Sequence, residues 1–197
     1  MSTITGHTGL TALLGSPVAH SISPLMHNEA FRLLELDYVY LCFDVNEETL
    51  PAAVAGLRTC GIRGFNLTMP NKNKIAELLD DLSPEAQLIG AVNTVLNDNG
   101  KLIGYNTDGY GFMQSVRDAG HDVTNKNITV MGVGGASMAI CAQSALDGAS
   151  SVHIFARRTS RYWNRTQKFA ENLTAKTGCQ VCLFDNDDHT ALKDSIA

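Results

Sequence analysis

The sequence predicts a mixed α/β fold built from two successive units. Apolar runs of strand length alternate with segments that carry apolar residues at helical spacing, the pattern of sheets joined by crossover helices. This alternation restarts at Asn127 after a polar stretch. The length of 197 residues suits one large domain or two small ones. We expect the first unit to span residues 1–107 and the second to span residues 108–197.

Composition narrows the class of protein. The net charge of −5 argues against a general nucleic-acid binder. The longest apolar runs are too short for a membrane span, and the N-terminus lacks the features of a signal peptide, so we expect a cytoplasmic protein without membrane contact. Five cysteines indicate free thiols. Cys179 and Cys182 form a C-x-x-C pattern, but residues three apart on a strand face opposite sides, so we predict no metal site.

The first unit reads as alternating strands and helices that end in a hairpin. Asn46 and Ser83 are expected helix caps, and Asn97-Asp98-Asn99-Gly100 is a turn between two strands. The predicted strands are 10–15, 38–45, 62–69, 90–96 and 101–105, and the predicted helices are 24–36, 47–58, 74–79 and a short one from 84. The almost continuous apolarity of 38–45 favours a buried parallel strand.

The first predicted helix begins with two hydroxyl side chains. Ser23 is a good N-cap, with Pro24 at the first helical position. Ser21 lies two residues earlier. Free N–H groups at a helix N-terminus favour an anion, so the two serines form a candidate carboxylate clamp, with simple capping by Ser23 as the alternative.

A second polar cluster follows the strand from residue 62. Asn66, Thr68 and Lys72 lie where Pro70 ends the strand, at the carboxyl edge where open α/β sheets bind ligands. An amide, a hydroxyl and an ammonium could grip a hydroxylated, anionic small molecule; the alternative is a plain turn with a solvated lysine. Asp108 precedes a predicted helix over 109–119. It either complements that helix N-terminus or pairs with Lys72 across a cleft.

The second unit opens with a nucleotide-binding pattern. A strand at 128–131 enters the turn Gly132-Val133-Gly134-Gly135-Ala136-Ser137, and a helix follows. This nearly fits the G-x-G-x-x-G/A dinucleotide fingerprint in its required strand-to-helix context. After the next strand, 151–155, the chain reads Ala156-Arg157-Arg158-Thr159-Ser160-Arg161, where arginines can take the 2′-phosphate of NADP. A solvated basic loop is the alternative. A helix at 166–176, a strand at 181–184 and a short tail complete the prediction.

Together these motifs resemble those of the shikimate dehydrogenase family, and their sequences are most similar to its quinate/shikimate branch. The motifs are residues 21–24, 66–72, 90–94, 106–109 and 132–137. The resemblance implies an N-terminal substrate-binding α/β domain and a Rossmann domain that binds NADP or NAD. It implies an oxidoreductase of aromatic amino-acid biosynthesis that interconverts shikimate and 3-dehydroshikimate, with quinate as a further candidate substrate and a homo-oligomer as one possible state.

The resemblance also implies individual roles. Lys72 and Asp108 would be the catalytic pair. Ser21 and Ser23 would hold the substrate carboxylate, and its hydroxyls would contact Asn66, Thr68, Asn93 and Asp108. The expected cofactor contacts are Gly132, Val133, Gly134, Gly135, Ala136, Ser137, Ala156, Arg157, Arg158, Thr159 and Arg161.

Three departures from the family pattern matter. Ala156 stands where the family usually has asparagine, and Thr159 stands where the quinate/shikimate branch can carry an acid that favours NAD. The second half of the nucleotide fold and the family's C-terminal glutamine segment are missing. We therefore expect a fragment or a truncated gene product with little activity of its own. A non-catalytic carboxylate- or nucleotide-binding remnant is the second hypothesis.

Overall fold

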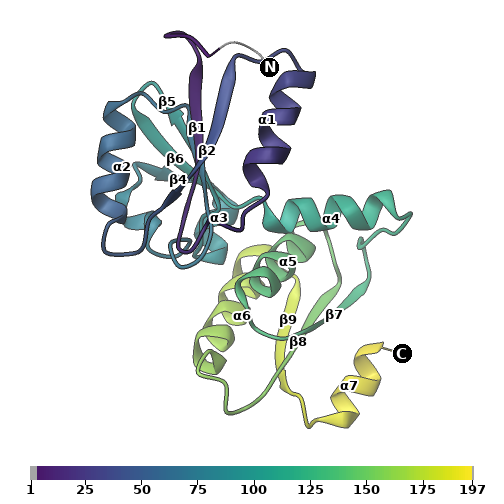
Figure 1. Ribbon diagram of the computed structural model, residues 1–197. Helices are drawn as coiled ribbons and strands as arrows, with labels where there is room; N and C mark the ends of the chain where they lie inside the picture. Colours follow the sequence, from purple (N-terminus) through teal and green to yellow (C-terminus); the bar gives the residue numbers. More distant parts are fainter. Residues whose placement is uncertain (1–3, 197) are drawn as a thin grey trace. The chain divides into compact units, whose positions relative to one another are not determined.

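The computed structural model describes residues 4–196 (Figure 1). The chain divides into two compact units, Met1–Tyr105 and Asn106–Ala197. Each unit holds a sheet with helices packed against it, so the predicted α/β class is confirmed. The two units are described separately below.

The first unit is built on a six-stranded sheet of order β2-β1-β3-β5-β6-β4. Its strands are β1 (Gly9–Gly15), β2 (Tyr38–Asp44), β3 (Gly64–Leu67), β4 (Asp81–Leu82), β5 (Thr94–Asp98) and β6 (Lys101–Tyr105). β1 pairs in parallel with both β2 and β3, whereas β5 runs antiparallel to β3 and forms the predicted hairpin with β6. The two-residue strand β4 was not predicted from the sequence.

Helices cover both faces of this sheet. They are α1 (Ser23–Leu33), α2 (Leu50–Thr59), the 3₁₀ helix η1 (Ile75–Leu78) and α3 (Pro84–Ile89). In Figure 1, α1 and α2 lie on opposite sides of the strands. Alternation along β1 explains this: Ala12 and Leu14 pack into the cluster that contains α2, whereas Leu13 packs with Tyr40 on the other face.

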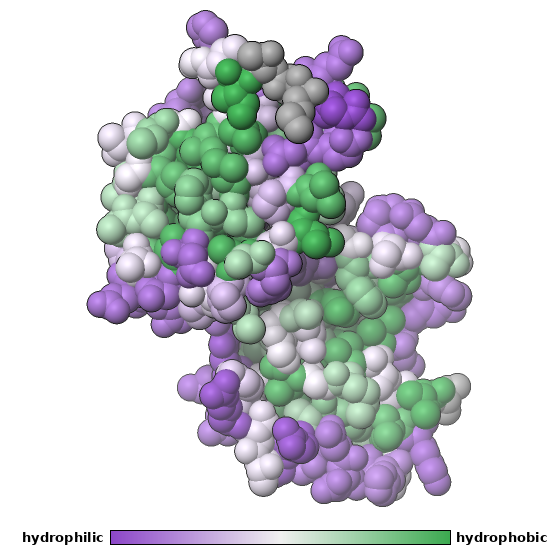
Figure 2. All heavy atoms as spheres, in the orientation of Figure 1, coloured by the Kyte–Doolittle hydropathy of each residue, from purple (hydrophilic) through white to green (hydrophobic). Residues whose placement is uncertain are grey.

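The apolar residues at helical spacing in α1 are not buried. No residue of α1 is buried, and Leu25 and Leu33 are 77% and 65% exposed. Hydrophobic atoms accordingly show on the surface at this helix in Figure 2. β2 lies at the edge of the sheet, since among the described residues only β1 pairs with it. Its Leu41 side chain is exposed, so the strand is less buried than predicted. An apolar pattern predicts burial but does not say which partner provides it.

Two predicted helix starts have different outcomes. Ser83 caps α3 as predicted, since its hydroxyl oxygen accepts the Ala86 N–H at 3.2 Å. α2 begins at Leu50, three residues later than predicted. The Asn46 carboxamide oxygen accepts the N–H groups of Glu48 and Thr49, both at 3.0 Å, so it closes a turn ahead of the helix.

The second unit alternates strictly between helix and strand. Its elements are α4 (Asp108–Asp118), β7 (Asn127–Met131), α5 (Gly135–Leu146), β8 (Ser151–Ala156), α6 (Trp163–Thr177), β9 (Gln180–Asp185) and α7 (His189–Ile196). The three strands are parallel in the order β7-β8-β9, which confirms the first half of a doubly wound sheet. α5 and α6 lie on one side of it and α7 on the other (Figure 1). α4 packs on α5 closely enough that a Cβ at Gly109 would collide with the Ala139 carbonyl.

Helix α7 was missed by the sequence analysis, which left residues after 185 as a tail. Asp188 initiates it by accepting the Ala191 N–H at 2.9 Å. Thr129 of β7 donates to the Ser195 carbonyl at 2.9 Å, and His153 of β8 lies 2.8 Å from the Ser195 hydroxyl. Among residues 4–196, none of the helices has the length and apolarity needed to cross a bilayer.

Candidate functional site

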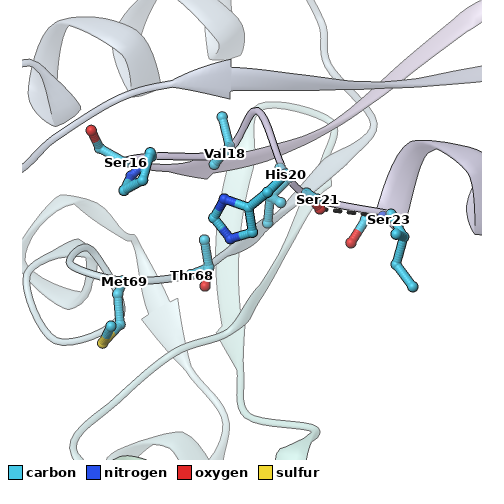
Figure 3. A pocket seen from close by; sticks show the side chains of 10 residues that line it. Ser16, Val18, His20, Ser21, Ser23, Thr68 and Met69 are labelled. Atoms are coloured by element: carbon cyan, nitrogen blue, oxygen red, sulfur yellow. Dashed lines mark hydrogen bonds between the residues drawn. The ribbon is translucent and has the colours of Figure 1, made fainter.

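A pocket of about 410 Å³ opens in the first unit between the β1–α1 loop and the end of β3. Ser21, Ser23 and Thr68, predicted from separate motifs, all line it. Figure 3 shows them around the pocket together with Ser16, His20 and Met69. The remaining lining residues are Leu13, Pro17, Val18 and Ile22. The pocket therefore offers four hydroxyl side chains and a helix N-terminus, a combination suited to an anionic, hydroxylated ligand.

The roles of the two serines in the helix start differ from the prediction. Ser23 is the first residue of α1 and does not cap it. Instead the Ser21 hydroxyl oxygen accepts the Ser23 N–H at 3.2 Å, drawn as a dashed line in Figure 3. Ser21 thus folds the loop back by a local side-chain turn. Both hydroxyl groups stay at the pocket.

The loop after β3 is held by main-chain and amide contacts. The Thr68 N–H donates to the Leu14 carbonyl at 3.1 Å, which continues the β1–β3 pairing by one residue. Asn71 is fully buried and donates its side-chain amide to the Val45 carbonyl at 2.7 Å. The Lys72 carbonyl accepts the Val92 N–H at 2.8 Å. These contacts fix the backbone of Lys72 next to the segment that carries Asn93.

Asn66 and Asn93 are connected within the first unit. Asn66 donates from Nδ2 to the Asn93 carbonyl at 3.3 Å and to the Thr94 hydroxyl at 3.0 Å. Its Oδ1 accepts the Tyr40 hydroxyl at 2.9 Å. Both hydrogens of the Asn66 amide are therefore directed at protein acceptors. Asn66, which the resemblance predicts to contact a ligand hydroxyl, can therefore only accept a further hydrogen bond, through Oδ1.

Tyr40 and His27 pack together next to Asn66. Tyr40 is buried, and its ring stacks on the His27 ring at 4.2 Å. Burial raises the pKa of the Tyr40 hydroxyl, with a smaller contribution from Cys42. Burial also lowers the pKa of His27. Both shifts favour the neutral form of each side chain, so these two side chains add no charge to the site.

Asp108 belongs to the second unit, where it is the first residue of α4. Its N–H donates to the Asn106 carboxamide oxygen at 3.1 Å. An acid in the first turn complements the partial positive charge of a helix N-terminus. This location agrees with the first predicted role of Asp108, in which its carboxylate complements the helix N-terminus. The predicted pairing with Lys72 remains a prediction.

The second unit contains a pocket of about 560 Å³ at the carboxyl ends of its strands. The predicted residues that line it are Gly132, Val133, Gly134, Ala156, Arg157, Thr159 and Arg161. Gly132 has φ = 104°, a left-handed conformation that favours glycine. A Cβ added at Gly134 would meet no atom within 4 Å, so the backbone here is bare toward the pocket. Gly135, Ala136 and Ser137 form the first turn of α5, whose N–H groups suit a pyrophosphate.

The arginines of the second pocket divide into two groups. Arg157 and Arg161 line it, whereas the Arg158 guanidinium lies over the Trp163 ring, 4.6 Å from its centroid. The assignment of Arg158 to the cofactor therefore gains no support from its position, and a cation–π contact accounts for the side chain. Arg161 also contacts Tyr162, both over its ring and through the hydroxyl.

Several lining residues were not predicted as site residues. Ser160, Tyr162 and Asn186 complete the second pocket. Ser16 and His20 complete the polar part of the first, and Met69 adds an apolar side chain. Asn186 follows β9, and its position at the carboxyl edge could have been derived from the strand order. His20 adjoins Ser21 in sequence, and its place in the polar loop before α1 is the signal that could have identified it. Residues 4–196 contain no His, Cys, Asp and Glu group suited to a metal, and all five cysteines are free thiols.

Comparisons with known proteins agree on one family. The model of the shikimate dehydrogenase substrate binding domain matches residues 13–95. A shikimate dehydrogenase (NADP(+)) of Listeria innocua is 50% identical over 194 residues, which cover 98% of this chain and 66% of the relative. One from Streptococcus pyogenes is 51% identical with the same coverage. The chain thus spans about two thirds of the length of these curated relatives.

Solved structures give the same picture. The crystal structure of shikimate 5-dehydrogenase from Listeria monocytogenes, in complex with shikimate and NAD, is 48% identical with a TM-score of 0.96, covering 100% of this chain and 68% of that one. The ligand-free 5-ketofructose reductase of a Gluconobacter strain is 32% identical with a TM-score of 0.85, covering 92% and 64%. The same fold thus occurs in proteins named for different substrates.

Proposed function

This chain belongs to the shikimate dehydrogenase family, and from that premise we propose that it forms the substrate site and the adenosine half of the cofactor site of an NADP-dependent shikimate dehydrogenase. The observation that carries the proposal is the convergence of Ser21, Ser23 and Thr68 on one pocket. A ring acid such as shikimate presents a carboxylate and hydroxyls, which such a pocket matches. Quinate, which differs in one hydroxyl and in ring unsaturation, remains a second candidate substrate.

We assign the roles as follows. Ser21 and Ser23 hold the ring carboxylate at the start of α1, where hydroxyl groups and helix N–H groups favour an anion. Thr68, Asn66 and Asn93 contact the ring hydroxyls. Lys72 carries the proton of the reacting oxygen and Asp108 orients it; both also contact the ring. When bound, the nicotinamide cofactor supplies or accepts the hydride.

The proton chemistry suits a lysine in this place. Oxidation of a ring hydroxyl to a carbonyl releases one proton from oxygen, and reduction returns it. A lysine can exchange that proton, and an aspartate beside it would orient the ammonium group. The fixed backbone of Lys72 favours reproducible placement of its ammonium group.

For the cofactor we propose NADP in preference to NAD. The pyrophosphate would lie on the Gly132–Gly134 turn and the N-terminus of α5, and the 2′-phosphate on Arg157 and Arg161. Guanidinium groups bind phosphate through paired, charge-assisted hydrogen bonds. We also propose a cytoplasmic location, because five free thiols are typical of a reducing compartment.

A turnover assay tests the proposal. Residues 1–197 are joined to the C-terminal third of the Listeria innocua relative, and NADPH formation is followed with shikimate and with quinate. Reduction of 5-ketofructose is measured in parallel. We expect shikimate with NADP to give the highest kcat/KM. If the chimera reduces only 5-ketofructose, shikimate is not its substrate and 5-ketofructose takes that place. If the chimera folds but shows no turnover, the result supports a non-catalytic binding remnant.

A further inference from the structure

A continuous series of hydrogen bonds crosses the sheet of the first unit from β2 to β5. The Tyr40 hydroxyl donates to Asn66 Oδ1 at 2.9 Å, and Asn66 Nδ2 donates to Thr94 Oγ1 at 3.0 Å. The Thr94 hydroxyl then donates to Asn93 Oδ1 at 2.9 Å. We call Tyr40, Asn66, Thr94 and Asn93 the amide relay. Neither Tyr40 nor Thr94 has a role in the function proposed above.

The relay lies on the same face of the sheet as the substrate pocket. Asn66 and Thr94 are opposed across β3 and β5, and Leu13 of β1 is the register partner of Asn66. Leu13 packs with Tyr40 and also lines the pocket. Thr68, two residues after Asn66, points to this face as well, because side chains alternate along a strand. The relay therefore lies on the pocket's face of the sheet, next to Leu13 and Thr68, which line the pocket.

All bonds of the relay point in one direction. Burial keeps the Tyr40 hydroxyl protonated, so toward Asn66 it acts as a donor. Asn66 must then accept through Oδ1 and donate through Nδ2. The Thr94 hydroxyl accepts a hydrogen bond from Asn66, and it donates its single hydrogen to Asn93 Oδ1. The two ends of an asparagine amide are nearly the same shape, so only such partners decide which end faces a ligand.

We propose that Tyr40 and Thr94 are positioning residues of the substrate site. They hold the Asn93 side chain with Oδ1 toward Thr94, and they leave the Asn66 side chain able only to accept. The site then requires a ring hydroxyl that donates to Asn66 Oδ1. This inference rests on the proposed function for shikimate as the ligand and for Asn66 and Asn93 as its contacts; the orientation of the two amides stands apart from it.

The test uses three single variants of the 197-residue chain. Tyr40→Phe removes only the hydroxyl, Thr94→Val removes the relay hydroxyl at nearly constant shape, and Thr94→Ser is the matched control that keeps it. Side-chain ¹⁵NH₂ resonances of Asn66 and Asn93 are followed by NMR without ligand. Tyr40→Phe should shift those of Asn66, Thr94→Val should shift those of both residues, and Thr94→Ser should leave Asn93 close to the parent position. Unchanged amide resonances in folded Tyr40→Phe and Thr94→Val would overturn the relay.

Shikimate titrations of the same variants test the link to the ligand. The loss of one relay bond should raise the Kd about fivefold in Tyr40→Phe and Thr94→Val, and less than about twofold in Thr94→Ser. Equal Kd values in all variants, with normal binding by the parent chain, would refute the positioning role and leave the proposed function intact. If the parent chain does not bind shikimate, both the role and the proposed substrate fail, and the amide resonances still decide whether the relay exists.

Discussion

At the scale of single residues, the backbone around Lys72 is determined by its neighbours. The Val92 N–H holds the Lys72 carbonyl, and buried Asn71 ties the same loop to Val45 at the end of β2. A lysine side chain has four rotatable bonds, and a fixed backbone reduces the number of conformations that it must give up on binding. This rigidity is what a proton carrier needs, since a misplacement of about 1 Å can cost about 100-fold in rate.

Removal of the Lys72 ammonium should therefore affect rate more than binding. In the chimera described above, Lys72→Ala should lower kcat with shikimate by about 10²–10⁴-fold, the usual contribution of an acid–base group, with a smaller change in the Kd for shikimate. Steady-state kinetics and equilibrium titration measure the two quantities. Lys74→Ala, two residues away with its ammonium 3.1 Å from Glu77, is the matched control and should leave kcat unchanged. A near-normal kcat in Lys72→Ala would remove this residue from the mechanism.

The arginines allow a second comparison between neighbours. Arg157→Ala should weaken binding of adenosine 2′,5′-bisphosphate by about tenfold or more, because a hydrogen bond to a charged group contributes about 1.5–3 kcal/mol. Binding of 5′-AMP, which lacks the 2′-phosphate, should change little. Arg158→Ala serves as the control, since that guanidinium packs on Trp163. Calorimetry on the 197-residue chain measures both ligands, and an equal loss for both in Arg157→Ala would contradict recognition of the 2′-phosphate.

Residue types and spacing were enough to predict part of the site and not the rest. Ser21, Ser23 and Thr68 were predicted from helix-start and strand-end rules, and they line one pocket. Arg158 carries the same charge as Arg157 and adjoins it in sequence, yet only Arg157 lines the second pocket. Spacing cannot separate them, because the choice depends on the position of Trp163. Tyr40 and Thr94 were missed because a hydrogen-bonded relay joins residues that are far apart in the chain.

At the scale of elements, the contrast between α1 and α2 shows what pattern reading omits. Both helices have apolar residues at helical spacing, but α2 buries Leu50 and Val54 whereas α1 buries none of its residues. Phe31 of α1 is only partly buried, against the cluster that contains Tyr40. A polar contact also attaches the helix: the Asn28 amide donates to the Tyr40 carbonyl at 2.9 Å and accepts the Tyr40 N–H at 2.8 Å. The Asn28 side chain thereby pairs with backbone groups of Tyr40 at the edge of β2, as a neighbouring strand would. A sequence pattern gives the apolar face, and topology decides whether anything covers it.

A pair of identical substitutions measures this contrast. Leu50→Ala on α2 should lower the free energy of unfolding by about 2–5 kcal/mol, since it removes a fully buried side chain. Leu33→Ala on α1 should change it by less than about 0.5 kcal/mol, because Leu33 is exposed and the two residues have similar helix propensity. Urea denaturation of both variants gives the values. A large loss in Leu33→Ala would mean that the apolar face of α1 is covered in solution.

At the scale of the whole molecule, each unit ends in an exposed strand edge. Within residues 4–196, β7 pairs only with β8, and β2 pairs only with β1. In a doubly wound sheet the strand that begins the fold lies at the centre, and its outer side pairs with the second half. Here that outer side of β7 presents unpaired backbone groups, which invite association with another chain.

The 197-residue chain should therefore self-associate through β7. Met131→Lys places a charge at the end of this edge and should lower the associated fraction seen by size-exclusion chromatography with light scattering. Met26→Lys on α1 is the matched control, because the charge change is the same and the two methionines are 59% and 57% exposed. A stronger effect of Met26→Lys would assign the association to α1, and a monomeric parent chain would refute the expectation.

We propose that shikimate binds in the first pocket and the adenosine part of NADP in the second, and NMR titration of the 197-residue chain tests this most directly. Shikimate should bind saturably and perturb backbone resonances around Ser21, Ser23 and Thr68. Adenosine 2′,5′-bisphosphate should bind saturably and perturb those around Gly132–Gly134, Arg157 and Arg161. Absence of saturable binding for both ligands, or perturbation of the same set of residues by both, would contradict the proposal.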